Sequence, residues 1–169
     1  MILLAYDGSA DADAAIDRAA RLLPGAEVTV LTVWEPFLDA ITRSGALGLG
    51  LGMRSAYADS ETIDAAARAA ALATAIRGAE HATAAGLKAQ PRCASRRGGI
   101  ARTILDAVLQ DNAELIVMGT RGLAGVASFL LGSVSHAVAQ HADRAVLVVP
   151  SRALADRRRG IVDHEAVPA

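Results

Sequence analysis

Residues 113–149 read AELIVMGTRGLAGVASFLLGSVSHAVAQHADRAVLVV, and this stretch decides the fold. It begins with a short apolar run, Ala113 to Met118, which predicts a buried strand. A glycine-rich loop from Gly119 to Leu131 leads to a predicted helix from Gly132 to His141, and Ala145 to Val149 predicts a final strand. A strand, a crossover that contains a helix and a second strand form the unit from which parallel sheets are built.

The same alternation of strands and helices runs through the rest of the chain. It predicts a single α/β domain over residues 1–150: a doubly wound, Rossmann-like fold with a five-stranded parallel sheet. Residues 38–57, where Gly and Leu alternate, are interpreted as a flexible loop, and the polar residues 151–169 as a disordered tail. The remaining expected elements are strands at Ile2–Tyr6, Glu27–Val33 and Leu87–Ala94, and helices from Ser9 to Leu23, from Asp59 to Ala85 and after Gly98-Gly99.

The composition excludes several classes of protein. The 169 residues include 17 basic and 18 acidic side chains, so no overall positive field favours a nucleic acid partner. The single lysine, Lys88, lies in Gly-Leu-Lys-Ala, which rules out a Walker A phosphate loop. The single cysteine, Cys93, excludes an internal disulfide. With neither a signal peptide nor an apolar run long enough to span a bilayer, we expect a cytoplasmic protein without membrane contact.

Two strands end in unusual loops, and these loops predict the place of a ligand. The first strand ends at Asp7-Gly8-Ser9 and the fourth at Gly119-Thr120-Arg121-Gly122. In open α/β sheets, ligands bind beyond the carboxyl ends of the strands, where the strand order reverses. The second loop leads to Gly132-Ser133 at the start of a helix, and free amides at a helix N-terminus favour an anion. We therefore predict a phosphate or mononucleotide site that needs no lysine.

The spacing Gly119-x-x-Gly122, nine residues, then Gly132-Ser133 resembles the Gly-2x-Gly-9x-Gly-Ser/Thr signature of the ATP-binding universal stress proteins. The opening Tyr6-Asp7-Gly8-Ser9 and the ending Ala-Val-Leu-Val-Val-Pro also resemble that family. The resemblance covers residues 1–150 and implies an adenine nucleotide alpha hydrolase-like sheet with strand order 3-2-1-4-5. It implies ATP as the ligand, with Mg²⁺ or Mn²⁺ bridged through the phosphates, and a homodimer formed through the strand at residues 145–149.

The resemblance also implies a role for each matched position. Asp7 would contact the nucleoside, and Val33 would meet adenine through its backbone. The ribose and the phosphates would be bordered by loop and helix residues that share one edge of the sheet. The full predicted set is Ala5, Tyr6, Asp7, Val33, Met118, Gly119, Arg121, Gly122, Gly132, Ser133, Val134 and Ser135.

No residue is predicted to be catalytic. We see no candidate base near the phosphates, so we expect a stress-response or regulatory module that hydrolyses ATP slowly or not at all. Three alternatives stay open: an adenylating or ATP-hydrolysing enzyme on the same fold, a binder of cyclic nucleotides, and an interaction module with an empty pocket. A Ser133–His136 nucleophile pair, a metal site at His136 and His141, redox sensing by Cys93 and anion binding by Arg157–Arg159 are minor hypotheses.

Overall fold

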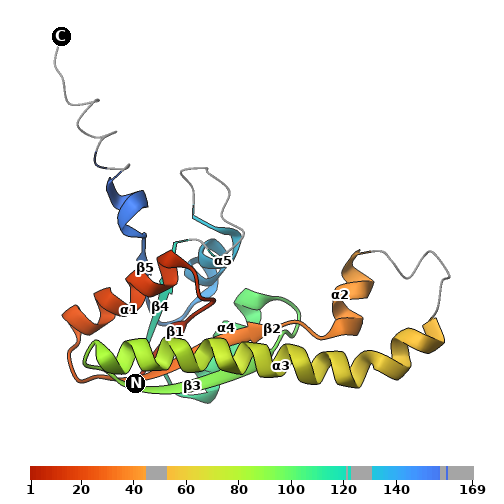
Figure 1. Cartoon of the computed structure of the whole chain (residues 1–169). Coiled ribbons are helices and arrows are strands. Elements are labelled where there is room, and N and C mark those ends of the chain that lie inside the picture. The colour runs from red at the N-terminus through yellow and green to blue at the C-terminus, as the bar shows by residue number, and fades with distance from the viewer. Residues whose placement is uncertain (45–52, 121, 123–130, 157–158, 160–169) are drawn as a thin grey trace, which may run out of the picture.

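A computed structural model describes residues 1–44, 53–120, 122, 131–156 and 159, with side chains described from residue 60 onward in the second range. Its five strands form one parallel sheet in the order β3-β2-β1-β4-β5 (Figure 1), which confirms the predicted fold class and strand order. The strands are β1 (Ile2–Ala5), β2 (Glu27–Trp34), β3 (Lys88–Ser95), β4 (Leu115–Gly119) and β5 (Ala145–Val149).

Helices cover both faces of the sheet. Helices α1 and α3 lie on one face and α4 and α5 on the other (Figure 1). With 32 residues, α3 is about 48 Å long at 1.5 Å per residue, and its N-terminal half extends past the carboxyl end of β2. The five helices of the described chain are α1 (Ala10–Leu22), α2 (Phe37–Ser44), α3 (Met53–Ala84), α4 (Ile100–Gln110) and α5 (Ser133–His141).

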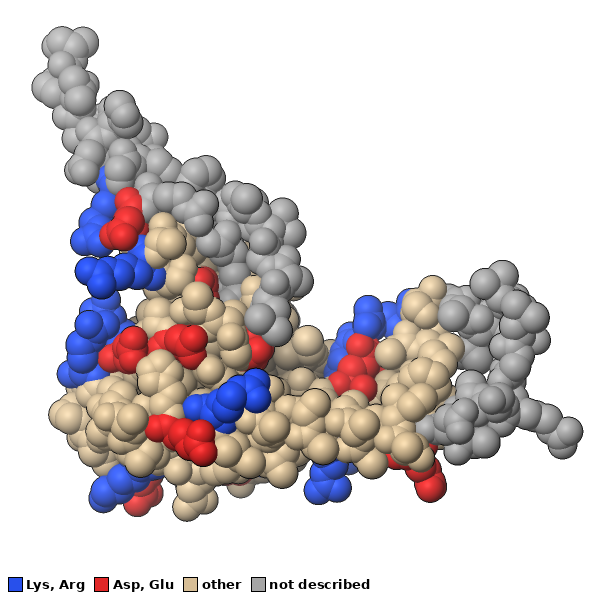
Figure 2. Space-filling model, in the orientation of Figure 1, with Lys and Arg blue, Asp and Glu red and all other residues tan. Residues whose placement is uncertain are grey.

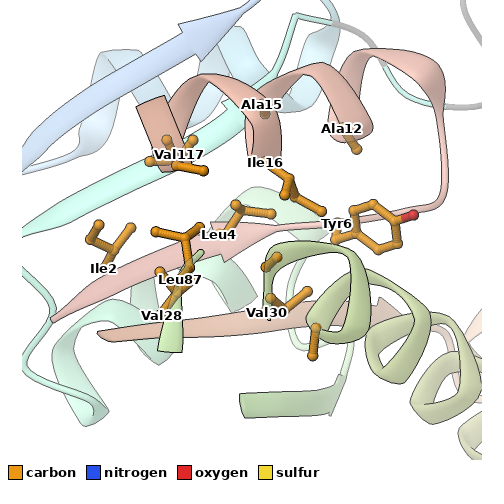
Figure 3. Close-up of a cluster of buried hydrophobic side chains, with 14 of the residues drawn as sticks. Ile2, Leu4, Tyr6, Ala12, Ala15, Ile16, Val28, Val30, Leu87 and Val117 are labelled. Atoms are coloured by element: carbon orange, nitrogen blue, oxygen red, sulfur yellow. The ribbon is translucent and has the colours of Figure 1, made fainter. Parts of the chain in front are cut away.

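Two buried clusters follow from the alternation of side chains along each strand. Ile2 and Leu4 point toward α1 and α3 (Figure 3), whereas Leu3 packs on the opposite side against α4 and α5. Ile16 of α1 packs into the first cluster and Ile104 of α4 into the second, and each is at most 2% exposed. Because β1 is buried on both faces, its residues read as one continuous apolar run.

The prediction of an irregular loop over residues 38–57 is wrong at both ends of that range. Helix α2 occupies residues 37–44 and α3 begins at Met53, whereas residues 45–52 lie outside the described chain. The Phe37 amide donates to Asp64 Oδ1 of α3 at 2.7 Å, so a carboxylate distant in sequence satisfies the open N-terminus of α2. A local pattern cannot reveal that partner.

The tail after β5 begins with structure. Residues 152–156 form a helical turn, in which the Ala155 amide donates to the Ser151 carbonyl at 2.9 Å. Leu154 of this turn is buried. The prediction of disorder therefore does not hold for this turn, and residues 157–158 and 160–169 lie outside the described chain.

Candidate functional site

Strands β1 and β4 are neighbours at the point where the sheet reverses its order. Ala5 pairs with Met118 across the two strands, so both strands end at the same edge of the sheet. From this edge, β1 leads into α1 on one face and β4 leads toward α5 on the other. This is the topological position at which open α/β sheets bind ligands.

Gly119 lets the end of β4 approach the first turn of α1. A Cβ atom added to Gly119 would lie 2.7 Å from the Asp11 carbonyl carbon and 2.9 Å from the Ala12 nitrogen. Ser9 caps this turn, because its hydroxyl accepts from the Ala12 amide at 3.2 Å. The structure thus gives Gly119 a packing role that the motif alone does not reveal.

Gly122 lies against the Asp7 carboxylate. A Cβ atom on Gly122 would overlap Asp7 Oδ2 and lie 3.6 Å from Asp7 Cγ. The other oxygen, Oδ1, accepts from the Ser9 amide at 3.0 Å and so fixes the carboxylate in the β1–α1 turn. The second glycine of the motif and the predicted nucleoside contact are therefore adjacent in space.

Thr120 connects the end of β4 to the start of α5. Its amide donates to the Val149 carbonyl at 2.9 Å, and its carbonyl accepts from the Gly132 amide at 2.9 Å. The Ser135 hydroxyl donates to the same carbonyl at 2.7 Å. These bonds bring the third glycine of the motif to the edge where the first two lie.

The N-terminus of α5 offers open donors at this edge. Gly132 is the N-cap, and within the described part of the chain no side-chain hydrogen bond caps the helix. Ser133 is exposed and Val134 is half-buried, whereas Ser135 is only 2% exposed. Since the Ser135 hydroxyl bonds inward to the Thr120 carbonyl, only the backbone amide of Ser135 remains for an anion.

Small apolar side chains border the same edge on the α4–α5 face. Ala5, Val33 and Val134 pack at the margin of the second buried cluster, which includes Met118. Tyr6 does not join them, because its ring packs in the first cluster, against α3 (Figure 3). The predicted lining by Tyr6 is therefore not made by its side chain.

The Tyr6 hydroxyl is also committed elsewhere, since it donates to Asp13 Oδ1 at 2.8 Å. Burial and this hydrogen bond raise the pKa of Tyr6 to about 12. The Tyr6 amide donates to the Leu31 carbonyl and the Tyr6 carbonyl accepts from Thr32 Oγ1. Tyr6 thus fastens the β1–α1 turn to β2 and to α1.

The minor hypotheses gain no structural support, and one predicted residue lies outside the description. Arg121 is not among the described residues. Within the described chain, no group of three His, Cys, Asp or Glu side chains is arranged to hold a metal ion. The His141 ring nitrogen Nδ1 lies 2.8 Å from the Ala137 carbonyl of its own helix, and Cys93 is half-buried in β3.

Sequence reasoning missed an ion-pair group at the neighbouring strand ends. Glu35, which follows β2, accepts hydrogen bonds from Arg43 of α2 and from Arg96 at the end of β3. The partners are 8 and 61 positions away from Glu35, so neither spacing carries a helical or strand period. The only available signal was the place of Glu35 two residues after a predicted strand.

Comparison with known proteins identifies the chain. The model of the universal stress protein family matches residues 1–150. The chain belongs to the universal stress protein family. A universal stress protein of Thermus aquaticus, encoded in the 3′ region of a QAH/OAS sulfhydrylase, is 35% identical over 150 residues, which cover 88% of this chain and 96% of the relative.

Solved universal stress proteins share the fold of this family member. One, in complex with cAMP, is 24% identical with a TM-score of 0.58, and the match covers 89% of this chain and 96% of that one. Another, from Archaeoglobus fulgidus in complex with dAMP, is 18% identical with a TM-score of 0.55, and the match covers 88% of this chain and 95% of that one.

None of the described helices is both long and apolar enough to cross a membrane.

Proposed function

We propose that this universal stress protein binds an adenine nucleotide at the carboxyl edge of β1 and β4, and that ATP is its ligand. The observation that carries the proposal is the convergence at Thr120, which brings the uncapped start of α5 to the edge where Gly122 lies against Asp7. Two relatives of the same fold contain adenine nucleotides, cAMP and dAMP, which supports an adenine base. Nucleotide binding would make the protein a stress-response or regulatory module.

The residues at this edge suit the parts of a nucleotide. The amides of Ser133, Val134 and Ser135 lie in the first turn of α5, where the positive end of the helix dipole favours phosphate oxygens. Asp7, an acceptor, suits a ribose hydroxyl, and the apolar margin at Ala5 suits the flat base. The proposed set also includes Val33, Met118, Gly119, Arg121, Gly122 and Gly132.

We propose that Mg²⁺ or Mn²⁺ accompanies ATP through the phosphates rather than through protein carboxylates. Mg²⁺ in nucleotide sites commonly keeps several waters and bonds to phosphate oxygens. Asp7 lies in the β1–α1 turn, where it already accepts from the Ser9 amide, and Asp11 lies in the first turn of α1. A bridged ion would neutralise phosphate charge without a cluster of protein ligands.

A cyclic nucleotide is the second candidate, because one relative of this fold contains cAMP. The α5 amides can bind a single phosphate as well as three.

Slow or absent hydrolysis is part of the first proposal, since no base has been assigned near the phosphates. The cytoplasmic location stays a prediction.

We also propose a homodimer formed through β5. The outer strands of the sheet are β3 and β5. The β3 edge carries exposed Lys88 and Pro91, a composition that discourages strand pairing, whereas Ala145–Val149 contains only aliphatic residues. An Ala145→Lys variant, charged at an exposed position of β5, should shift the mass measured by light scattering from dimer to monomer; a wild-type monomer would contradict the proposal.

Isothermal titration with Mg-ATP and with cAMP tests the binding proposal. We expect Asp7→Ala and Gly122→Ala to weaken binding at least tenfold, because the first removes the ribose acceptor and the second displaces it. Glu114→Ala, which removes an exposed acidic side chain at the start of β4 and thus at the opposite end of the sheet, is the matched control. No heat release by the wild type at millimolar ligand would refute nucleotide binding.

A further inference from the structure

Helix α2 is attached to the rest of the protein at both of its ends. At its start, the Phe37 amide donates to Asp64 Oδ1 of α3. At its end, Arg43 donates to Glu35 through two bonds, from Nε to Oε1 at 2.9 Å and from Nη2 to Oε2 at 2.6 Å. A paired, planar contact of this kind fixes orientation as well as distance. An eight-residue helix thereby acquires a defined position that its own propensity would not supply.

Glu35 joins this helix to a second segment. Arg96, which follows β3, donates through Nη1 to Glu35 Oε1, and the Arg96 amide donates to the Trp34 carbonyl at 2.7 Å. The hydrogen bond from Arg43, together with the charges of Arg96 and Arg43, holds the pKa of Glu35 below its ordinary value. One carboxylate, 24% exposed, therefore lies between two guanidinium groups from different elements.

This group follows the strand end that carries Val33, the predicted adenine contact. Only Glu35 and Pro36 separate the end of β2 from the start of α2, so Phe37 lies within about 10 Å of Trp34 along the chain. Val33, the predicted adenine contact, pairs with Ala94 at the same edge. In Figure 2 basic and acidic side chains gather on the described surface at α2.

We propose that Glu35 is a positioning residue that places α2 and the segment after β3 as a wall for the nucleotide base, and so sets base selectivity. The proposal rests on the adenine nucleotide site proposed above. We assign the phosphates and ribose to α5 and to the β1–α1 turn, which follow β4 and β1. Glu35 instead follows β2, two residues after Val33, the predicted base contact. A change at Glu35 should therefore alter the recognition of the base more than that of the phosphates.

The test is a Glu35→Gln variant, titrated with Mg-ATP and, by competition, with Mg-GTP. Glutamine keeps the size of the side chain but loses the charge that joins Arg43 to Arg96. We expect ATP affinity to fall about tenfold, within the range typical of coupled sites, and the preference for ATP over GTP to shrink in proportion. Asp39→Asn is the matched control, because Asp39 is an exposed acid of the same helix that forms no ion pair with another described residue.

Arg43→Gln provides a second route to the same result. Its side chain is 60% exposed, so its loss has little effect on the core, yet it removes both bonds that orient α2. Both variants should share the loss of selectivity, and the double variant should lose little more than either one. Unchanged selectivity in Arg43→Gln, equal weakening of ATP and GTP, or a wild type without base preference would overturn the inference while leaving nucleotide binding in place. A wild type that binds no nucleotide would overturn both.

Discussion

Replacing Gly119 by alanine tests the packing of β4 against α1. The added Cβ would lie 2.7 Å from the Asp11 carbonyl carbon, 2.8 Å from the Asp11 Cβ and 2.9 Å from the Ala12 nitrogen. Since ordinary contacts begin near 3.4 Å, the strand and the helix would have to separate by about 0.7 Å. Neither partner yields easily, because the atoms opposite are mostly backbone of a helix turn capped by Ser9.

The expected loss is about 3 kcal/mol, at the upper end of the range for overpacked cores. For a chain of this size, that loss corresponds to a fall in melting temperature of about 6–12 °C. Urea unfolding followed by circular dichroism measures the free energy of unfolding, and a thermal scan checks the shift. The slope of the urea transition should stay unchanged, because the surface exposed on unfolding is the same.

Gly86→Ala is the control that separates steric overlap from backbone strain. Gly86 has a positive φ of +99°, but a Cβ there meets nothing within 4 Å. Its loss should therefore be about 1–2 kcal/mol, the cost of a left-handed conformation for an L-residue. If Gly119→Ala is no less stable than Gly86→Ala, the close approach of β4 and α1 does not control stability and the reasoning fails.

Three further substitutions test contacts around the site. The pKa of Tyr6 is about 12 in the folded protein and about 10 in an unfolded chain, so protonated Tyr6 stabilises the fold fully below pH 10 and this stabilisation is lost as pH rises to 12. The free energy of unfolding of the wild type should therefore fall by about 2–3 kcal/mol over this range, whereas Tyr6→Phe, which lacks the hydroxyl that bonds to Asp13, should not show this fall; an identical pH profile by urea unfolding would contradict this. Ser135→Ala should cost about 0.5–1.5 kcal/mol, because the Thr120 carbonyl loses one of its two donors and keeps the Gly132 amide, and an unchanged urea midpoint would contradict the assignment. Asp64→Ala should cost about 1 kcal/mol by uncapping α2 and should raise amide hydrogen exchange in that helix; unchanged exchange would show that the cap is unimportant.

Local pattern predicted most of the fold. The apolar run in β4 and the aliphatic run in β5 were each recognised from a few consecutive residues, because buried strands need side chains that suit both faces. Ser9 was recognised as the start of a helix, and its hydroxyl accepts a hydrogen bond from the Ala12 amide there. The alternation of glycine and leucine at residues 45–52, by contrast, concealed the preceding helix at residues 37–44, whose cap comes from Asp64.

The candidate site was predicted in outline, and the structure refined the role of individual residues. The glycine spacing predicted one edge for Gly119, Gly122 and Gly132, and the strand order shows that β1 and β4 are neighbours there. The tasks of these residues depend on neighbours that the spacing does not specify. Gly119 admits the backbone of α1, Gly122 admits the Asp7 carboxylate, and the Ser135 hydroxyl bonds inward instead of toward a ligand.

By itself, then, the sequence determined the family and the alternation of strands and helices, and it predicted the sheet edge that we propose for a nucleotide. Those features depend on short-range periodicity and on a motif within one loop and helix. Only the tertiary structure decided that Tyr6 faces α3, that Thr120 connects β4, β5 and α5, and that Glu35 bridges two arginines. The physical reason is that each of these contacts joins groups from separate elements, and side-chain direction and distance are defined only once the sheet and its helices have packed.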